Sequence, residues 1–388
     1  MSTVLTLFGT RPEVIKLAPV IRALGRRLDI RSVNVSSSQH TDLLHPFVRQ
    51  LRLTVDHDLA VMTEGQSPAD VLARVVAGLS RVIASERPDL VLVQGDTTTA
   101  LAGALAGYYA RVPVGHVEAG LRTGNRHSPF PEEINRRLIS RIAELHFAAT
   151  PRNVDALLAE EVAGDRIFLT GNPVVDTLQG ILADGTPSAE LGTLLAGLAG
   201  KRLVTVTTHR RENAGDVMAG HLRALRRFVD RHDDVAVVFP VHPNPAVRAA
   251  AQSELAGAAR IHCVAPLDYA DFVHLLSRSW LIASDSGGIQ EEAPTLGKPV
   301  LILRDTTERP EVLECGTGRL VGHSGARFES MLEEAHADPA WAQHARSIGN
   351  PFGSGDAGER IAVVVQAFLD PGPDQPAAPT LAVAGGGE

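Results

Sequence analysis

Residues 285–292 read Asp285-Ser286-Gly287-Gly288-Ile289-Gln290-Glu291-Glu292 and follow an apolar run, residues 280–284, that is typical of a buried strand. Adjacent glycines let backbone N–H groups approach a ligand closely, and a helix that begins here would leave its first N–H groups available to an anion. Glu292 lies one turn further on, where its carboxylate could accept two ribose hydroxyls. A serine-capped helix after a tight turn explains the same residues, so this stretch alone leaves both interpretations open.

Strands and helices alternate along the rest of the chain in the same way. Predicted strands end in polar residues, and segments with helical periodicity follow them. These strands lie at residues 4–8, 30–38, 89–93, 112–117, 146–150 and 167–171 in the first half, and at 203–208, 235–241, 261–265, 280–284 and 299–303 in the second. The alternation predicts an α/β protein with two doubly wound, Rossmann-like domains facing a central cleft, where the carboxyl ends of the strands bind a ligand.

Changes in composition mark the expected domain boundaries. We expect an N-terminal Rossmann-like domain at 1–183, a linker region with glycines and small residues at 184–200, and a C-terminal Rossmann-like nucleotide-binding domain at 201–369. The segment 370–388 is rich in proline, glycine and alanine. Such a composition predicts a disordered tail.

The 388-residue chain has 44% hydrophobic and 21% charged residues, as globular proteins do. No run approaches the roughly 20 apolar residues that span a bilayer, and the N-terminus lacks the basic region and cleavage site of a secretory signal. The only cysteines are Cys263 and Cys315, which argues against a disulfide framework and fits a reducing cytoplasm. The net charge of −8 argues against general affinity for nucleic acids or membrane surfaces.

Three carboxylates stand at or soon after predicted strand ends in the first half. Asp96 follows the strand at 89–93, Glu118 follows the next strand, and Glu132 lies at the start of the next predicted helix. Like charges gathered in one cleft raise pKa values and produce acid–base partners. Each residue also has a structural explanation, since Asp96 could cap a helix and Glu132 could form an i,i+4 surface pair with Arg136.

The first predicted strand is followed by the turn Gly9-Thr10-Arg11 and by a helix that carries Lys16. Arg11 and Lys16 flank the start of that helix, where they could hold a phosphate or a carboxylate. A solvated Arg11 and a Lys16 paired with Glu13 are the structural alternatives. Because no G-x-G-x-x-G fingerprint follows this strand, a nicotinamide dinucleotide is not indicated.

Taken together, the motifs resemble the non-hydrolysing UDP-N-acetylglucosamine 2-epimerase family over roughly residues 3–369. Each motif alone is weak, but their order and combination are specific; they lie at residues 9–13, 95–99, 115–124, 131–133, 209–212, 240–242, 285–294 and 304–311. The resemblance implies a GT-B-like fold, a homodimer, and reversible conversion of UDP-GlcNAc to UDP-ManNAc through elimination of UDP to 2-acetamidoglucal and readdition. It implies no cofactor and no essential metal.

The resemblance also implies roles for individual residues. It matches the family's catalytic residues to Asp96, Glu118, Glu132 and His209, the histidine contacting the diphosphate. It matches UDP-sugar binding to Arg11, Lys16, Phe272, Ser286, Gly287, Gly288, Glu292 and Arg309. In this set residues 286–288 would hold the diphosphate, Glu292 the ribose, Phe272 the uracil side and Arg309 the nucleotide end.

Some relatives carry a second UDP-GlcNAc site that activates them. The residues at the corresponding positions here are Gln39, His40, Gln66 and His242. Thr41 and Asp42 stand where many relatives have Arg or Lys and then Gln or Glu, and Gly65 replaces an arginine of some relatives. We therefore expect this possible regulatory site to be weakened and the rate to depend hyperbolically on UDP-GlcNAc.

Three other interpretations compete with a non-hydrolysing epimerase. A GT-B glycosyltransferase shares the sheet pattern and the nucleotide motif, but it gives no reason for Asp96, Glu118 and Glu132 together. A catalytically silent UDP-sugar-binding protein would need residues 285–292 and would tolerate loss of the carboxylates. A hydrolysing epimerase would release free ManNAc and UDP.

Overall fold

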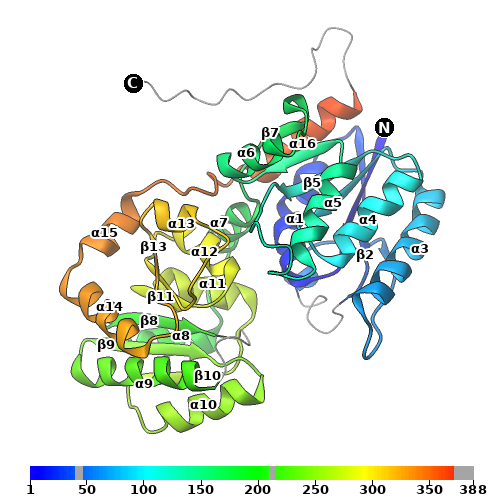
Figure 1. The fold of residues 1–388 in the computed structure, drawn as a ribbon. Helices are drawn as coiled ribbons and strands as arrows, with labels where there is room; N and C mark the ends of the chain where they lie inside the picture. Colours follow the sequence, from blue (N-terminus) through cyan, green and yellow to red (C-terminus); the bar gives the residue numbers. More distant parts are fainter. Residues whose placement is uncertain (40–46, 209–214, 371–388) are drawn as a thin grey trace, which may run out of the picture. The chain divides into compact units, whose positions relative to one another are not determined.

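A computed structural model describes residues 1–39, 47–208 and 215–370. The chain divides into two units (Figure 1), which are Met1–Thr177 with the segment from Phe352 onward, and Leu178–Pro351. We call them unit 1 and unit 2. Each contains one parallel sheet with helices interleaved between its strands, which confirms the predicted α/β class with two doubly wound domains.

The sheet of unit 1 has the strand order β3-β2-β1-β4-β5-β6-β7, and every neighbouring pair is parallel. Its strands are β1 (Ser2–Phe8), β2 (Ile30–Ser36), β3 (His57–Asp58), β4 (Leu90–Gln94), β5 (Val114–Ala119), β6 (Leu145–Ala148) and β7 (Ile167–Leu169). The order changes direction between β1 and β4. The loops after these two strands therefore diverge, which is where doubly wound sheets bind ligands.

The helices of unit 1 connect these strands. They are α1 (Arg11–Gly25), α3 (Pro68–Glu86), α4 (Thr98–Tyr109), α5 (Glu132–Ile142), α6 (Pro151–Ala159), the short 3₁₀ helix η1 (Gly164–Arg166), α7 (Val174–Asp184, across the boundary between the units) and α16 (Ala357–Leu369). Helix α4 packs against α3 and α5. Buried side chains of α3, α4 and α5 form one apolar core with β1, β2 and β4. None of the described helices combines the length and apolarity that a membrane crossing requires.

Helix α16 belongs to unit 1, whereas we expected residues up to 369 to lie in the second domain. It packs against α1 although the two are far apart in the sequence (Figure 1). Gly358 permits this contact, because a Cβ atom there would lie 2.8 Å from the backbone of Pro19. The Asp176 carboxylate accepts hydrogen bonds from the first N–H groups of α16, Ala357 and Gly358, at 3.2 and 2.8 Å. Helical periodicity predicts the apolar face of α16 but not its partner.

The sheet of unit 2 has the order β10-β9-β8-β11-β12-β13, again with parallel neighbours. Its strands are β8 (Arg202–Thr207), β9 (Val235–Pro240), β10 (Ile261–Val264), β11 (Leu281–Ser284), β12 (Val300–Ile302) and β13 (Gly318–Leu320). Its helices are α8 (Ala189–Gly197), α9 (Asp216–Arg231), α10 (Pro245–Leu255), α11 (Tyr269–Arg278), α12 (Gly287–Thr295), α13 (Glu311–Glu314), α14 (Gly325–Ala337) and α15 (Ala340–Ser347).

The segment 184–200, expected as a linker, contains helix α8 instead. Ser188 caps the helix by accepting a hydrogen bond from the Leu191 N–H at 3.2 Å. Leu191 is buried in a small apolar cluster with Leu203 of β8 and Leu275 of α11. The small residues of this segment suggested a linker, but its leucines recur at helical spacing and pack on the sheet. The predicted tail from residue 371 onward lies outside the described residues.

Candidate functional site

Glu118 and Lys16 form a buried ion pair at the carboxyl end of the unit 1 sheet. The Nζ atom of Lys16 lies 2.6 and 2.7 Å from the two carboxylate oxygens of Glu118, and the side chains are 10% and 7% exposed. The Gln94 amide also donates to the Glu118 carboxylate. These donors fix the carboxylate in one orientation.

The backbone of Glu118 has a positive φ of 62°, an unusual value for a residue with a side chain. The register between β5 and β6 shifts at the same place, between Val117 and Ala119. Such an irregularity re-aims a side chain at a strand end. The sheet therefore presents Glu118 by a local distortion that the strand pattern of the sequence does not reveal.

Asp96 follows the neighbouring strand β4 and is held by helix α5. Two nitrogens of Arg136 contact the Asp96 side-chain atom Oδ2, with Nε at 2.8 Å and Nη2 at 2.6 Å. The Asn135 amide donates to the backbone carbonyl of Asp96 at 2.8 Å. Because β4 and β5 are paired, Asp96 and Glu118 lie at the same edge of the sheet. Glu132, half-buried, is the first residue of α5, so the helix bonded to Asp96 also begins with the third predicted carboxylate.

The charged start of α5 is more buried than the surface ion-pair face that we considered. Glu133 and Arg137 do form an i,i+4 pair at 3.2 Å. Arg136, however, is buried with 5% of its side chain exposed, and it bonds to Asp96 and to fully buried Glu133. The charges of Glu133 and Arg136 are therefore buried in the site region, whereas Arg137 is exposed to solvent.

Two buried groups that sequence reasoning missed support the loops of this edge. Glu13 accepts hydrogen bonds from the Gly9 and Thr10 N–H groups at 3.0 and 2.8 Å and from the Thr97 hydroxyl at 2.7 Å, and burial raises its pKa. His116 is fully buried and donates from Nε2 to the Gly95 carbonyl at 2.7 Å. Burial lowers the pKa of His116 to about 3, so the imidazole is neutral. Glu13 thus links the loop after β4 to the start of α1, while Lys16 pairs with Glu118.

Arg11 is an exposed cation at the start of α1. Its guanidinium lies over the ring of Phe47, with Cζ 5.4 Å from the ring centroid. Exposure is what we expected if Arg11 were a solvated charge, and it also leaves the guanidinium accessible to an anion.

In unit 2 the predicted glycine motif does begin a helix. Ser286, in extended backbone, is the N-cap of α12, and Gly287 is its first residue. A Cβ atom at Gly287 would lie 2.8 Å from Nη1 and 3.2 Å from Cζ of Arg309. The Arg309 guanidinium therefore lies against the backbone of Gly287, and its Nε donates to Glu291 at 2.6 Å. The helix start, Gly288 and Arg309 together form a group of backbone and cationic donors.

Glu292 is buried and accepts a hydrogen bond from the Tyr269 hydroxyl at 2.9 Å. Tyr269 begins α11, and Phe272 of the same helix packs on the apolar cluster beneath α12. The structure thus brings Glu292 and Phe272 to neighbouring helices, as a shared nucleotide site requires. Sequence reasoning missed Tyr269, because nothing in its local pattern points to Glu292.

The residues expected at a second site are only partly described. Gln39 accepts a hydrogen bond from the Thr99 hydroxyl at 2.8 Å, and Gln66 accepts one from the Thr63 N–H at 3.1 Å. His242, in unit 2, is exposed and accepts one from the Asn244 N–H at 3.2 Å. His40 lies outside the described residues, as do Thr41, Asp42 and the predicted catalytic residue His209.

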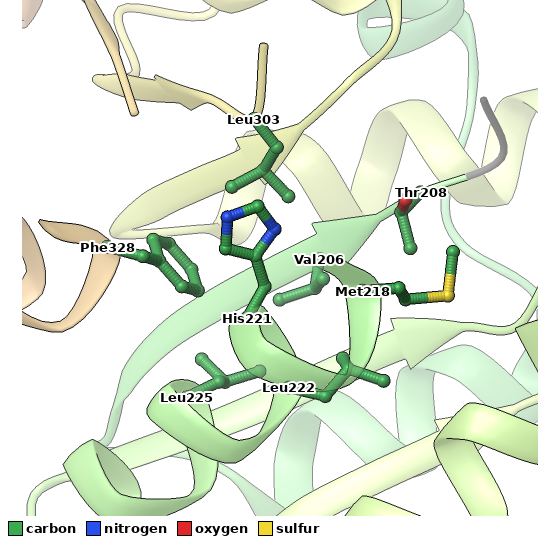
Figure 2. Close-up of a pocket in the computed structure, with 8 residues that line it drawn as sticks. All are labelled: Val206, Thr208, Met218, His221, Leu222, Leu225, Leu303 and Phe328. Carbon is green, nitrogen blue, oxygen red and sulfur yellow. The ribbon is translucent and has the colours of Figure 1, made fainter. Parts of the chain in front are cut away.

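Figure 2 shows a small pocket of unit 2 into which the His221 ring projects. Val206, Leu225 and Phe328 are among its lining residues and belong to the main apolar core of this unit. Burial lowers the pKa of His221, which favours the neutral ring. None of the predicted site residues that the structure describes lines this pocket, and most of its lining belongs to the apolar core of unit 2.

Comparisons with known proteins agree on one family. A family model described as UDP-N-acetylglucosamine 2-epimerase matches residues 22–366. The UDP-N-acetylglucosamine 2-epimerase of Bacillus subtilis strain 168 is 43% identical over 358 residues, covering 92% of this chain and 93% of the relative. The enzyme of the same name from Escherichia coli K12 is 43% identical over 363 residues, covering 92% and 96%.

Solved structures give the same result for the fold. A structure of Staphylococcus aureus MnaA with UDP has a TM-score of 0.89 and 37% identity, covering 97% of this chain and 99% of that one. A Neisseria meningitidis UDP-GlcNAc 2-epimerase bound to UDP-GlcNAc has a TM-score of 0.85 and 38% identity, covering 95% and 100%. These neighbours confirm the expected GT-B-like fold class.

Proposed function

Because this chain belongs to the UDP-N-acetylglucosamine 2-epimerase family, we propose that it interconverts UDP-GlcNAc and UDP-ManNAc without releasing free sugar. The observation that carries most weight is the buried Lys16–Glu118 pair at the sheet edge where Asp96 also lies. A binding protein has no need of a distorted strand end that orients a buried carboxylate. Acid–base chemistry does need such a group.

The reaction that we propose begins with departure of UDP. The C2 hydrogen has no adjacent carbonyl, so its direct removal is very difficult. When the C1–O bond to the diphosphate breaks, positive charge develops at C1 and the C2–H bond becomes acidic. A base takes the proton, the C1=C2 double bond forms, and 2-acetamidoglucal results. Protonation at the other face of C2 and return of UDP to C1 then complete the inversion.

Unit 1 would supply the proton-transfer groups. Glu118, Asp96 and Glu132 are the proposed acids and bases, because carboxylates at one sheet edge can take different protonation states. Lys16 and Arg136 are positioning residues that hold Glu118 and Asp96. Arg11 of unit 1, and His209 from the sequence of unit 2, are the residues proposed to assist departure of the diphosphate by stabilising its negative charge.

Unit 2 would bind the nucleotide. The N–H groups at the start of α12 and the Ser286 hydroxyl suit the diphosphate, and Arg309 adds positive charge beside Gly287. Glu292 would accept the ribose hydroxyls, with Phe272 near the uracil.

We further propose that the enzyme acts in the cytoplasm as a homodimer. Its chemistry requires neither a nicotinamide nor a metal, since proton transfer and leaving-group stabilisation suffice.

NMR of the purified protein with UDP-GlcNAc alone tests the proposed outcome. An equilibrating pair of nucleotide sugars is expected. Free ManNAc with stoichiometric UDP would identify a hydrolysing enzyme instead. No reaction until a sugar acceptor is added would favour a glycosyltransferase.

Replacing Tyr269 by phenylalanine should weaken nucleotide binding while leaving the chemical step intact. The change removes the hydrogen bond that orients Glu292 Oε1, so the carboxylate is no longer held in place for the ribose hydroxyls that it is proposed to accept. Calorimetric titration with UDP should show lower affinity, with kcat nearly unchanged. Tyr108→Phe, at a 62% exposed tyrosine, is the control. Equal losses in both variants, or a fall in kcat alone, would remove the role assigned to Tyr269.

A further inference from the structure

Four titratable side chains meet in unit 2 where the end of α9, the start of β9 and the end of α14 come together. The His336 Nε2 atom lies 3.0 and 3.1 Å from the two carboxylate oxygens of Asp234. The His232 Nε2 atom lies 2.7 Å from Glu333 Oε2. The two imidazole rings are stacked, with centroids 4.0 Å apart and an interplanar angle of 35°. One ligand atom each from His232, Asp234 and His336 lies within 4.8 Å of the others.

Aromatic packing holds both imidazoles in place. The buried ring of Phe228 lies 4.7 Å from the His232 ring and 5.8 Å from the His336 ring, measured between centroids. The indole of Trp280 meets His336 edge-on at 6.2 Å. The side chains of His232 and His336 are 22% and 19% exposed. The rings are therefore anchored on the core and still reachable from solvent, as ligands for an exchangeable ion should be.

The charges around the cluster discriminate between classes of cation. Arg202 lies 3.2 Å from Asp234, and Arg231 lies 2.7 Å from Glu333. Two arginines thus balance the two carboxylates, so the cluster does not attract hard cations such as Mg²⁺ or Ca²⁺ by net charge. Imidazole nitrogens instead favour zinc, nickel, copper and related ions.

The distances suit a small tetrahedral ion. Zinc lies about 2.0–2.2 Å from nitrogen and oxygen ligands, which corresponds to about 3.3 Å between two ligands of a tetrahedron. The observed separation of 3.0–3.1 Å between His336 and Asp234 is close to this value. The three ligand atoms lie within 4.8 Å of one another, so they must close up by at most about 1.5 Å to reach the tetrahedral separation.

We propose that His232, Asp234 and His336 form a site for a divalent transition-metal ion of the zinc class, with Glu333 or water as the fourth ligand. Without metal, the same groups form two histidine–carboxylate hydrogen bonds. With metal, the ion links the end of α14 to the turn between α9 and β9. The site is structural, and it does not depend on the function proposed above.

Titration of the untagged, chelator-treated full-length protein with Zn²⁺ tests the proposal. We expect one equivalent of Zn²⁺ to bind at this site and to raise the Tm. When Co²⁺ is added first, it should bind with a tetrahedral absorption band, and Zn²⁺ should then displace it. His232→Gln and His336→Gln should each weaken this binding by at least about tenfold, since even outer-shell changes reach that size. Mg²⁺ should have no effect.

His323→Gln is the matched control, because His323 forms a single histidine–carboxylate pair with Asp305 at 3.0 Å. This variant should keep full zinc affinity. The Tm of each metal-free variant shows whether it is folded, and the Co²⁺ spectrum of the unchanged protein gives a second measurement that needs no variant. Absence of zinc binding, binding unchanged in both histidine variants, or an octahedral Co²⁺ spectrum would each overturn the proposed site.

Discussion

Replacing Glu118 by glutamine is expected to lower the turnover of UDP-GlcNAc by at least about 10²-fold, the contribution of one well-placed acid or base. The amide cannot take a proton from carbon, and it also leaves Lys16 without the carboxylate that lies 2.6 Å from it. Initial-rate measurement of UDP-ManNAc formation gives the result. UDP affinity should change less than turnover, because most of the groups proposed to bind the nucleotide lie in unit 2.

Glu161→Gln is a close control for this variant. Glu161 also has a positive φ, 63°, but it is exposed and is no part of the proposed site. Any general effect of placing glutamine at a left-handed position should therefore appear there too. Near-normal turnover of Glu118→Gln, or an equal loss in Glu161→Gln, would contradict the role proposed for Glu118.

Replacing Glu133 by alanine is expected to destabilise unit 1 by about 3–5 kcal/mol, as loss of one partner in a buried ion pair does. Glu133 is fully buried and accepts from the Thr123 N–H at 2.9 Å, with Arg136 and Arg137 at 3.3 and 3.2 Å. Its removal takes away one of the negative charges that balance the positive charge of the buried Arg136 guanidinium. Chemical unfolding followed by circular dichroism measures the free energy of unfolding.

The pH dependence of this loss has a definite sign. Burial alone would raise the pKa of Glu133, but the Thr123 hydrogen bonds and the charges of Arg136 and Arg137 lower it below its ordinary value of 4.5. The carboxylate therefore stabilises the fold above pH 4.5, and its contribution is lost as the pH falls through the lower folded-state pKa. The difference between the two proteins should shrink in that acidic range.

Glu144→Ala serves as the control for Glu133→Ala. Glu144 pairs with Arg166 at 2.6 Å, but both side chains are exposed, by 42% and 51%. An exposed pair contributes about 0–1 kcal/mol. Two outcomes would show that burial does not set the free-energy contribution of the Glu133 interactions. One is a similar loss of unfolding free energy in both variants, and the other is a loss in Glu133→Ala that grows as the pH falls below 4.5.

The fold follows closely from local patterns in the sequence. Buried apolar runs such as β4 and β11 and the residues after them were predictable, because central strands of a parallel sheet are apolar on both faces. The placement of α16 was not, since an amphipathic helix specifies an apolar face without specifying its partner. Helix α8 was missed because small residues masked its leucine periodicity.

The candidate site was predictable to a smaller extent. The motifs located Asp96, Glu118 and the start of α12 at strand ends, where the structure has them. Spacing alone suggested that Arg136 was a surface partner, whereas tertiary packing buries it against Asp96. The hydrogen bond from Tyr269 to Glu292 joins residues from different helices. Such contacts depend on how elements pack, and local patterns do not encode them individually.

Elimination and readdition require that the C2 proton leave the sugar and that another return. The most direct test is therefore NMR of the nucleotide sugars after reaction of UDP-GlcNAc with the enzyme in D₂O. We expect UDP-ManNAc that carries deuterium at C2, and gradual appearance of deuterium at C2 of UDP-GlcNAc as the reaction reverses. UDP-ManNAc that retains the original hydrogen at C2 in every turnover would contradict this mechanism.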